Sequence, residues 1–235
     1  LRKWIPQYIS MIFVPLLALV PTVIIAHTVL GPIGWTIGQW VSEVVYAGLT
    51  GDFRWLFGLF FGTLYSPLVI TGLHHMSNAI DLQLIADFGG TNLWPMIALS
   101  NIAQGSAVLA IIFLHRGNEK EEQVSIPAAI SCYLGVTEPA MFGINIKYIY
   151  PFVAAMIGSG IAGLVATTFN VMANSIGVGG IPGFLSIQTD SMAMFIVCMA
   201  IAIVVPFLLT VLFEKKQLFA PKGEVEEAPV IQTKK

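Results

Sequence analysis

One carboxylate inside a long apolar run is the first candidate for chemistry in this chain. Glu138 stands in Leu134-Gly135-Val136-Thr137-Glu138-Pro139-Ala140-Met141-Phe142-Gly143 and is the only formally charged residue between Glu122 and Lys147. Placing an ionisable group at membrane depth costs about 2.5–3.5 kcal/mol on insertion scales. The Gly, Thr and Pro residues around it interrupt a helix. A charge on interrupted backbone within a hydrophobic segment indicates a substrate or ion site.

Glu138 has two possible roles in such a site. Beside Thr137 and the free backbone groups of a hairpin tip, its carboxylate can accept hydrogen bonds from a sugar hydroxyl. The alternative is a purely structural buried glutamate that pairs with Lys147 or a histidine.

An adjacent histidine pair, His74-His75, stands where an apolar helix is expected to end. One ring can face a cavity while the other bonds to the backbone. A lone histidine is more often a satisfied core residue, but a pair at a broken helix favours a functional role. We expect no metal here, because adjacent side chains diverge and no Cys or HxxxH pattern supplies further ligands.

Further polar residues lie in otherwise apolar sequence. Asn78 and Asp81, with Gln83 and Asp87, either line a sugar or ion site or cap the helices of a hairpin. Asn101 and Gln104 share a helix face, which favours interhelical hydrogen bonds. The two cysteines, Cys132 and Cys198, are expected to be small core residues.

Composition sets the class of protein. Of 235 residues, 56% are hydrophobic and only 10% are charged, and the mean hydropathy is +0.82. Soluble domains carry about 25% charged residues, so the chain is predicted to be an integral membrane protein in contact with lipid. A net charge of −2 suggests no nucleic-acid partner. Without a phosphate loop, zinc signature or Ser-His-Asp order, we expect neither a cofactor nor a metal.

The elements that must position these residues are apolar helices and two interrupted segments. The fold class is predicted to be an all-α polytopic membrane protein, the helices joined by a turn at Gly31-Pro32 and other loops. The segments 74–92 and 125–146 are predicted to be two opposed re-entrant hairpins. Residues 1–213 form the transmembrane part and 214–235 a charged cytoplasmic tail. The expected membrane spans are residues 4–30, 35–50, 54–73, 94–114, 148–173 and 192–213.

Basic residues orient this arrangement. If 35–50 recrosses the membrane, the Lys and Arg residues of the loops all lie on one side, which the positive-inside rule makes cytoplasmic. Both ends of the chain are then cytoplasmic. The hairpin 74–92 enters from outside and the hairpin 125–146 from the cytoplasm.

Two motifs resemble those of phosphotransferase-system permeases, the EIIC proteins of the glucose superfamily. The run from Gly135 to Gly143 resembles the family signature G-[IV]-T-E-P-A-[LMI]-F-G. The run Gly62-Thr63-Leu64-Tyr65-Ser66-Pro67-Leu68-Val69-Ile70-Thr71-Gly72-Leu73-His74-His75 resembles a second conserved block, and residues 74–85 are most similar to the trehalose permeases.

The resemblance implies import of a disaccharide, with trehalose favoured over sucrose or a β-glucoside. It implies phosphorylation of the sugar 6-hydroxyl by the phosphocysteine of an EIIB domain, which is fed by EIIA and HPr. It also implies that Glu138 and either His74 or His75 contact the sugar, with Thr137 as a further contact. The implied setting is the bacterial inner membrane, and the implied assembly of the full-length protein is a homodimer.

The chain differs from the full family pattern. Compared with the complete family pattern, it lacks about five N-terminal helices and the cysteine of an EIIB domain. We therefore expect it to be part of a longer protein and to phosphorylate no sugar by itself.

Two other classes of protein remain open. An ion-coupled secondary sugar transporter could use Glu138, Asp81 and the histidines as a proton relay. A membrane sensor or scaffold would use the hairpins only for packing.

Overall fold

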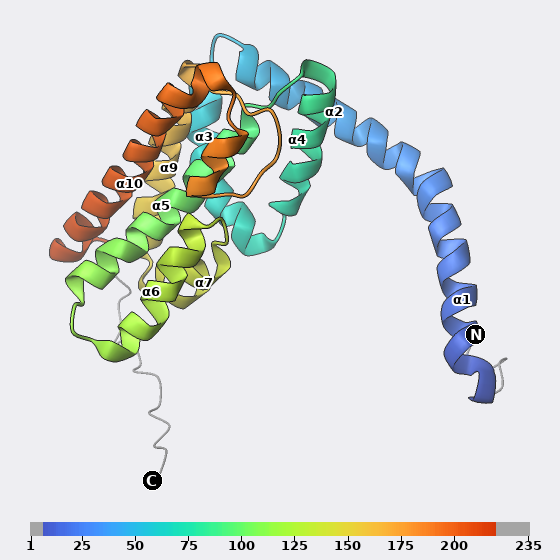
Figure 1. The fold of residues 1–235 in the computed structure, drawn as a ribbon, viewed down its shortest axis with the longest axis horizontal. Coiled ribbons are helices and arrows are strands. Elements are labelled where there is room, and N and C mark those ends of the chain that lie inside the picture. Colours follow the sequence, from blue (N-terminus) through green and yellow to red (C-terminus); the bar gives the residue numbers. More distant parts are fainter. Residues whose placement is uncertain (1–6, 220–235) are drawn as a thin grey trace. The chain divides into compact units, whose positions relative to one another are not determined.

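A computed structural model describes residues 7–219, which are mostly helical (Figure 1). The chain divides into two compact units, residues 1–45 and 46–235. Four helical stretches in the described residues are long and apolar enough to cross a membrane: Met11–Ile37, Leu93–Leu114, Tyr150–Thr168 and Thr189–Lys215. The expectation of an all-α polytopic membrane protein is confirmed.

The first unit is helical from residue 7 onward. Helix α1 (Gln7–Ile25) passes through the π-helical turn η1 (Ala26–Leu30) directly into α2 (Gly31–Thr50). The expected turn at Gly31-Pro32 is therefore wrong. Pro32 is the second residue of α2, and because the helix continues from η1, the wider π-helical turn before it accommodates the proline; in that turn the Gly31 N–H bonds to the carbonyl of Ala26. The orientation inferred above required a recrossing after this turn, so it stays a prediction.

The second unit contains the remaining helices, and α5 is its centre. Helix α5 is buried along nearly its whole length and packs against α3, α6, α9 and α10. In chain order the elements are α3 (Arg54–Thr71), α4 (His75–Phe88), α5 (Leu93–Leu114), α6 (Glu119–Tyr133), α7 (Glu138–Ala140), the π-helix η2 (Met141–Asn145), α8 (Ile146–Tyr148), α9 (Tyr150–Thr168), the 3-10 turns η3 (Ile181–Ser186) and η4 (Thr189–Ser191), and α10 (Met192–Lys215).

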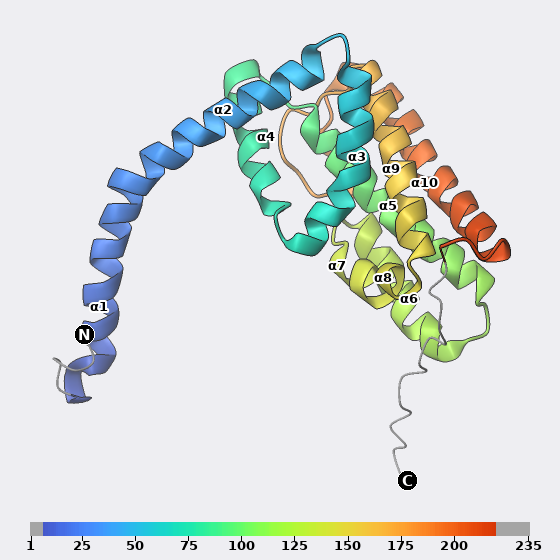
Figure 2. The same cartoon turned by 180° about the vertical axis from the view of Figure 1, so that it is seen from behind.

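Small residues let α3 and α9 approach closely. The two helices lie side by side in Figure 2, with α10 next to α9. A Cβ atom added to Gly58 would collide with the carbonyl of Gly163, and one added to Gly62 would collide with that of Ser159. The Ser159 hydroxyl donates to the Gly62 carbonyl at 2.5 Å. This is the small-residue packing by which membrane helices associate without a hydrophobic driving force.

The α4–α5 and α9–α10 connections are joined through their backbones. Thr91 and Ala173 exchange two hydrogen bonds, and Ala173 also forms an isolated bridge with Ile187. The Asn92 amide donates to the carbonyl of Val171 at 2.9 Å. These contacts hold the beginning of α5 against the loop that precedes α10.

The two segments predicted to be hairpins fold differently. Residues 125–146 form a helical hairpin, because α6 ends at Tyr133 and the chain turns at residues 134–137 into the helical run 138–148. Residues 74–92 instead hold one helix, α4, which lies between two glycines with left-handed backbone, Gly72 (φ 76°) and Gly89 (φ 75°). The depth of either segment in a membrane stays a prediction.

Candidate functional site

Glu138 is the first residue of α7, directly after the turn of its hairpin. That turn requires glycine at 135, where φ is 100° and an added Cβ would stand 2.7 Å from the backbone nitrogen of Gly179. The Asn101 amide donates to the Gly135 carbonyl at 3.3 Å. The turn is therefore held between α5 and the α9–α10 connection.

His74 and Glu138 come together across the second unit. The Nε2 atom of His74 lies 3.9 Å from Oε1 of Glu138, and the two side chains are 15% and 46% exposed. This distance is too long for a hydrogen bond. The carboxylate is thus accessible beside a mostly enclosed imidazole, which is an arrangement that can hold a polar ligand.

His74 is positioned by its neighbours in the short break between α3 and α4. Tyr65, which is buried on α3, presents its ring edge-on to His74 with the ring centres 6.4 Å apart. The ring of His75 lies 4.0 Å from that of His74. The Nδ1 atom of His74 is buried and has no hydrogen-bond partner among residues 7–219. Of the two histidines, His74 is therefore the one that the structure places beside Glu138.

The other residues proposed from the sequence lie in different surroundings. Thr137 is buried next to Glu138 in the chain, and Asn78 is exposed on α4. Asp81 is fully buried, and its Oδ1 accepts a hydrogen bond from the Thr91 hydroxyl at 2.6 Å. Gln83 donates to Asp87 one helical turn away at 2.9 Å. Both contacts join side chains, and neither is the side-chain-to-backbone bond of a helix cap.

A buried polar chain joins the hairpin to the bundle, and sequence reasoning identified only part of it. The Gln104 amide donates to the Ser66 hydroxyl at 2.7 Å, and Ser66 pairs with Ser100 at 3.2 Å. The Asn145 amide donates to the side-chain oxygen of Gln104 at 2.5 Å. Asn145 ends the π-helix that follows Glu138, and such turns are frequent at functional sites. A lone amide in an apolar run was the available signal for Asn145.

Within residues 7–219, no group of three or more His, Cys, Asp or Glu side chains is arranged so that it could hold a metal ion. Both cysteines are buried, as expected for core residues. A cavity of about 360 Å³ lies where α2 meets α3, lined by residues 47–60 and containing none of the proposed site residues.

The sequence profile of the family described as "Phosphotransferase system, EIIC" matches residues 1–159. This chain belongs to the EIIC family. The hairpin residue Glu138 and the His74-His75 pair both lie inside the matched range. No solved structure matches the chain.

Curated relatives of the same EIIC family are similar over most of this chain. A "PTS system trehalose-specific EIIBC component" from Escherichia coli (strain K12) is 52% identical over 210 residues, which cover 89% of this chain and 44% of the relative. A relative with the same description from Bacillus subtilis (strain 168) is 46% identical over 88% of this chain and 44% of the relative. A "PTS system sucrose-specific EIIBC component" from Pasteurella multocida (strain Pm70) is 44% identical over 92% of this chain and 46% of the relative. The chain spans less than half the length of these relatives.

Proposed function

We propose that this chain is the sugar-binding and translocating part of a phosphotransferase-system permease that imports a disaccharide. The sugar is phosphorylated at its 6-hydroxyl by the phosphocysteine of an EIIB domain on another part of the protein. The observation that carries the proposal is the approach of His74 to Glu138 at 3.9 Å, within a chain of the EIIC family.

The chemistry of the site follows from these two side chains. Phosphoryl transfer needs an oriented hydroxyl and a group that takes its proton. Glu138 accepts a hydrogen bond from the 6-hydroxyl and takes the proton while the phosphoryl group moves from the cysteine sulfur to the sugar oxygen. The His74 Nε2 faces the same space and contacts the sugar. Thr137 is a further contact, His75 is the alternative to His74, and Asn78 and Asp81 are candidates on α4.

The proposal includes partners and a location. EIIB is the phosphoryl donor and is itself supplied by EIIA and HPr. The full-length protein is a homodimer in the bacterial inner membrane, and both ends of this chain are cytoplasmic. The EIIBC descriptions of the relatives support an EIIB partner. The helical hairpin that carries Glu138 and the tail after α10 then belong to the same side of the membrane.

Trehalose is the proposed substrate. The similarity of residues 74–85 to trehalose permeases supports it, as does the 52% identity to one trehalose-specific relative, which exceeds the 46% and 44% identity to two sucrose-specific relatives. Sucrose is the competing substrate, since its transporters match nearly the same share of the chain.

Uptake of radiolabelled sugar tests the proposal. Membrane vesicles carrying the full-length protein are supplied with trehalose or sucrose, with and without phosphorylated EIIB. We expect trehalose 6-phosphate inside the vesicles only with phosphorylated EIIB. Unmodified sugar that accumulates with an ion gradient would instead indicate a secondary transporter, and no uptake of either sugar would contradict the permease.

A further inference from the structure

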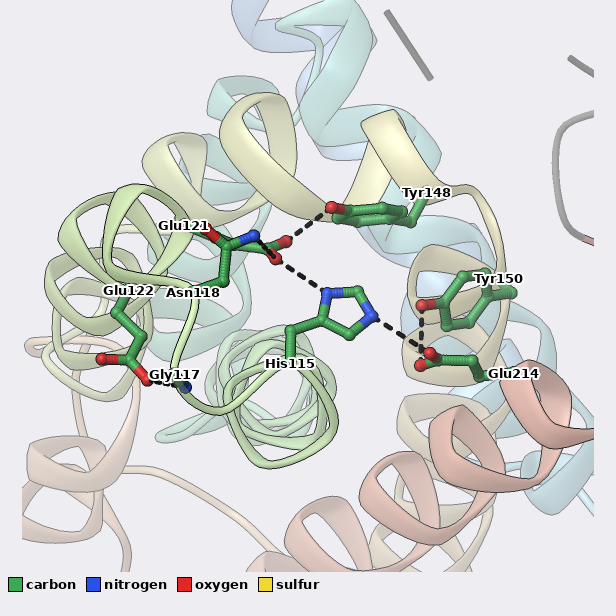
Figure 3. Close-up of polar contacts among 8 residues, drawn as sticks. All are labelled: His115, Gly117, Asn118, Glu121, Glu122, Tyr148, Tyr150 and Glu214. Atoms are coloured by element: carbon green, nitrogen blue, oxygen red, sulfur yellow. Dashed lines mark hydrogen bonds and ion pairs between the residues drawn. The ribbon is translucent and has the colours of Figure 1, made fainter. Parts of the chain in front are cut away.

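Figure 3 shows a cluster of polar contacts around His115. It lies near the beginning of α6, whereas Glu138 follows the end of that helix. Its centre is His115, the residue that follows α5. The Nδ1 atom of His115 lies 2.8 Å from Oε2 of Glu121 on α6, and its Nε2 lies 3.0 Å from Oε1 of Glu214 on α10. The His115 side chain is 24% exposed. We call His115, Glu121, Tyr148, Tyr150 and Glu214 the His115 cluster.

This geometry selects the charged form of His115. A neutral imidazole has one N–H and one acceptor nitrogen, whereas an ionised carboxylate only accepts. With a carboxylate oxygen at each ring nitrogen, both nitrogens must donate, so the ring is an imidazolium. Burial opposes this charge, but the hydrogen bonds and negative charges of Glu121 and Glu214 outweigh it and raise the pKa of His115 above its usual value.

Two tyrosines extend the cluster to the far end of the Glu138 hairpin. The Tyr148 hydroxyl donates to Oε1 of Glu121 at 2.6 Å, and the Tyr150 hydroxyl donates to Oε2 of Glu214 at 3.0 Å. Between them stands Ile149 with φ 66° and ψ −55°. A β-branched residue with positive φ is strained, and such strain persists only where surrounding contacts maintain it.

The cluster therefore holds both ends of one segment. Glu121 lies in the first turn of α6 and is bonded to His115. Tyr148, which ends α8, is bonded to Glu121, so the two ends of the run 119–148 are joined to each other and, through Glu121, to His115. Glu214 adds the end of α10 as a fixed point. On the same side, Glu122 accepts from the Gly117 N–H at 2.9 Å and the Lys147 ammonium lies 5.1 Å from the centre of the Tyr148 ring.

We propose that His115 is a pH-dependent positioning residue for Glu138, which in its charged form fixes both ends of the hairpin 119–148 against α10. The inference rests on the proposed function for the role of Glu138. When His115 loses a proton, one ring nitrogen turns a lone pair toward a carboxylate and that link is lost. The ends of the hairpin stay bonded to each other through Glu121 and Tyr148, but His115 no longer holds them against α10, and Glu138 is positioned less firmly for the sugar hydroxyl.

Hydrogen–deuterium exchange of the full-length protein in lipid nanodiscs tests the structural step without any sugar. Exchange of residues 119–148 is followed from pH 6 to pH 9 after correction for intrinsic rates. In wild type we expect protection to fall as pH rises. His115→Gln should be poorly protected at every pH, and His115→Arg, a permanent cation with several donors, should stay protected at pH 9. His27→Gln, at an exposed histidine of η1, is the matched control and should follow wild type.

Sugar phosphorylation with phosphorylated EIIB tests the catalytic step on the same variants. We expect kcat of His115→Gln to be roughly 10-fold below wild type at pH 6, because small misplacements of a reacting group are costly, and to approach wild type at pH 9. Equal exchange and equal kcat of His115→Gln and wild type at all pH values would overturn the proposal, as would altered exchange with unaltered kcat. A wild type that phosphorylates no sugar would contradict the proposed function, and exchange alone would then decide whether His115 holds the hairpin.

Discussion

The Nε2 atom of His74 and the Oε1 atom of Glu138 stand 3.9 Å apart, although one follows α3 and the other begins α7. The distance exceeds that of a direct hydrogen bond, and a hydroxyl can contact both atoms at once. The turn at Gly135, which Asn101 and the Gly179 backbone hold in place, determines where the carboxylate lies relative to the imidazole.

Glu138→Gln should abolish most sugar phosphorylation with little effect on folding. The amide keeps the shape of the side chain but cannot take a proton, and general-base assistance contributes about 10²–10⁴-fold. Phosphorylation is measured in the full-length protein with phosphorylated EIIB, and folding by thermal unfolding in detergent. Glu119→Gln, at an exposed residue of α6, is the control. Normal phosphorylation by Glu138→Gln would refute the role of this carboxylate as base.

The two histidines should differ when each is replaced by glutamine. His74 faces Glu138, whereas His75 is exposed and contacts the His74 ring. Losing a hydrogen bond to a polar ligand costs about 1.5 kcal/mol, or roughly 10-fold in affinity. We therefore expect KM for trehalose to rise about 10-fold in His74→Gln and to change little in His75→Gln. A larger effect at position 75 would assign the sugar contact to the other ring.

Local patterns in the sequence predicted the break between α6 and α7 and made Glu138 and the His74-His75 pair candidates, because a charge or a helix break in an apolar run is visible without tertiary structure. The same patterns did not predict that residues 74–92 hold one helix, α4. The turn expected at Gly31-Pro32 did not form, since a π-helical turn accommodates Pro32 within one helix. The partners of Asn145 and His115 depend on which helices become neighbours. Periodicity alone does not contain that information.

Asn145→Ala should destabilise the second unit. It removes the donor from the buried side-chain oxygen of Gln104, and an unsatisfied buried polar group costs about 1–3 kcal/mol. Denaturant unfolding of Asn145→Ala, Gln104→Ala and the double variant measures the effect. We expect the double variant to be less destabilised than the sum of the single variants, because the residues are in contact. Simple additivity would argue against this contact.

Gly163→Ala should weaken the packing of α3 against α9. The added methyl group would lie 2.5 Å from the carbonyl oxygen of Gly58, a distance that Cβ atoms in real structures essentially never show. Such overpacking costs about 1–3 kcal/mol of stability. Gly34→Ala is the matched control, since nothing lies within 4 Å of the position its Cβ would occupy. Alanine there should be neutral or stabilise the helix by up to about 1 kcal/mol. Equal unfolding temperatures for the two variants would contradict close α3–α9 contact.

Thermal stability should fall with rising pH through the His115 cluster. The pKa of His115 is raised in the folded protein, because the bonds to Glu121 and Glu214 outweigh its burial. Charged His115 contributes its full stabilisation to the fold at pH values below the pKa of histidine in the unfolded chain, about 6.5. This stabilisation is lost as the pH rises through the pKa of His115 in the folded protein. We therefore expect the difference in Tm between wild type and His115→Gln to be largest at pH 6 and to shrink toward pH 9. A difference that is constant or grows with pH would show that His115 is not charged in the fold.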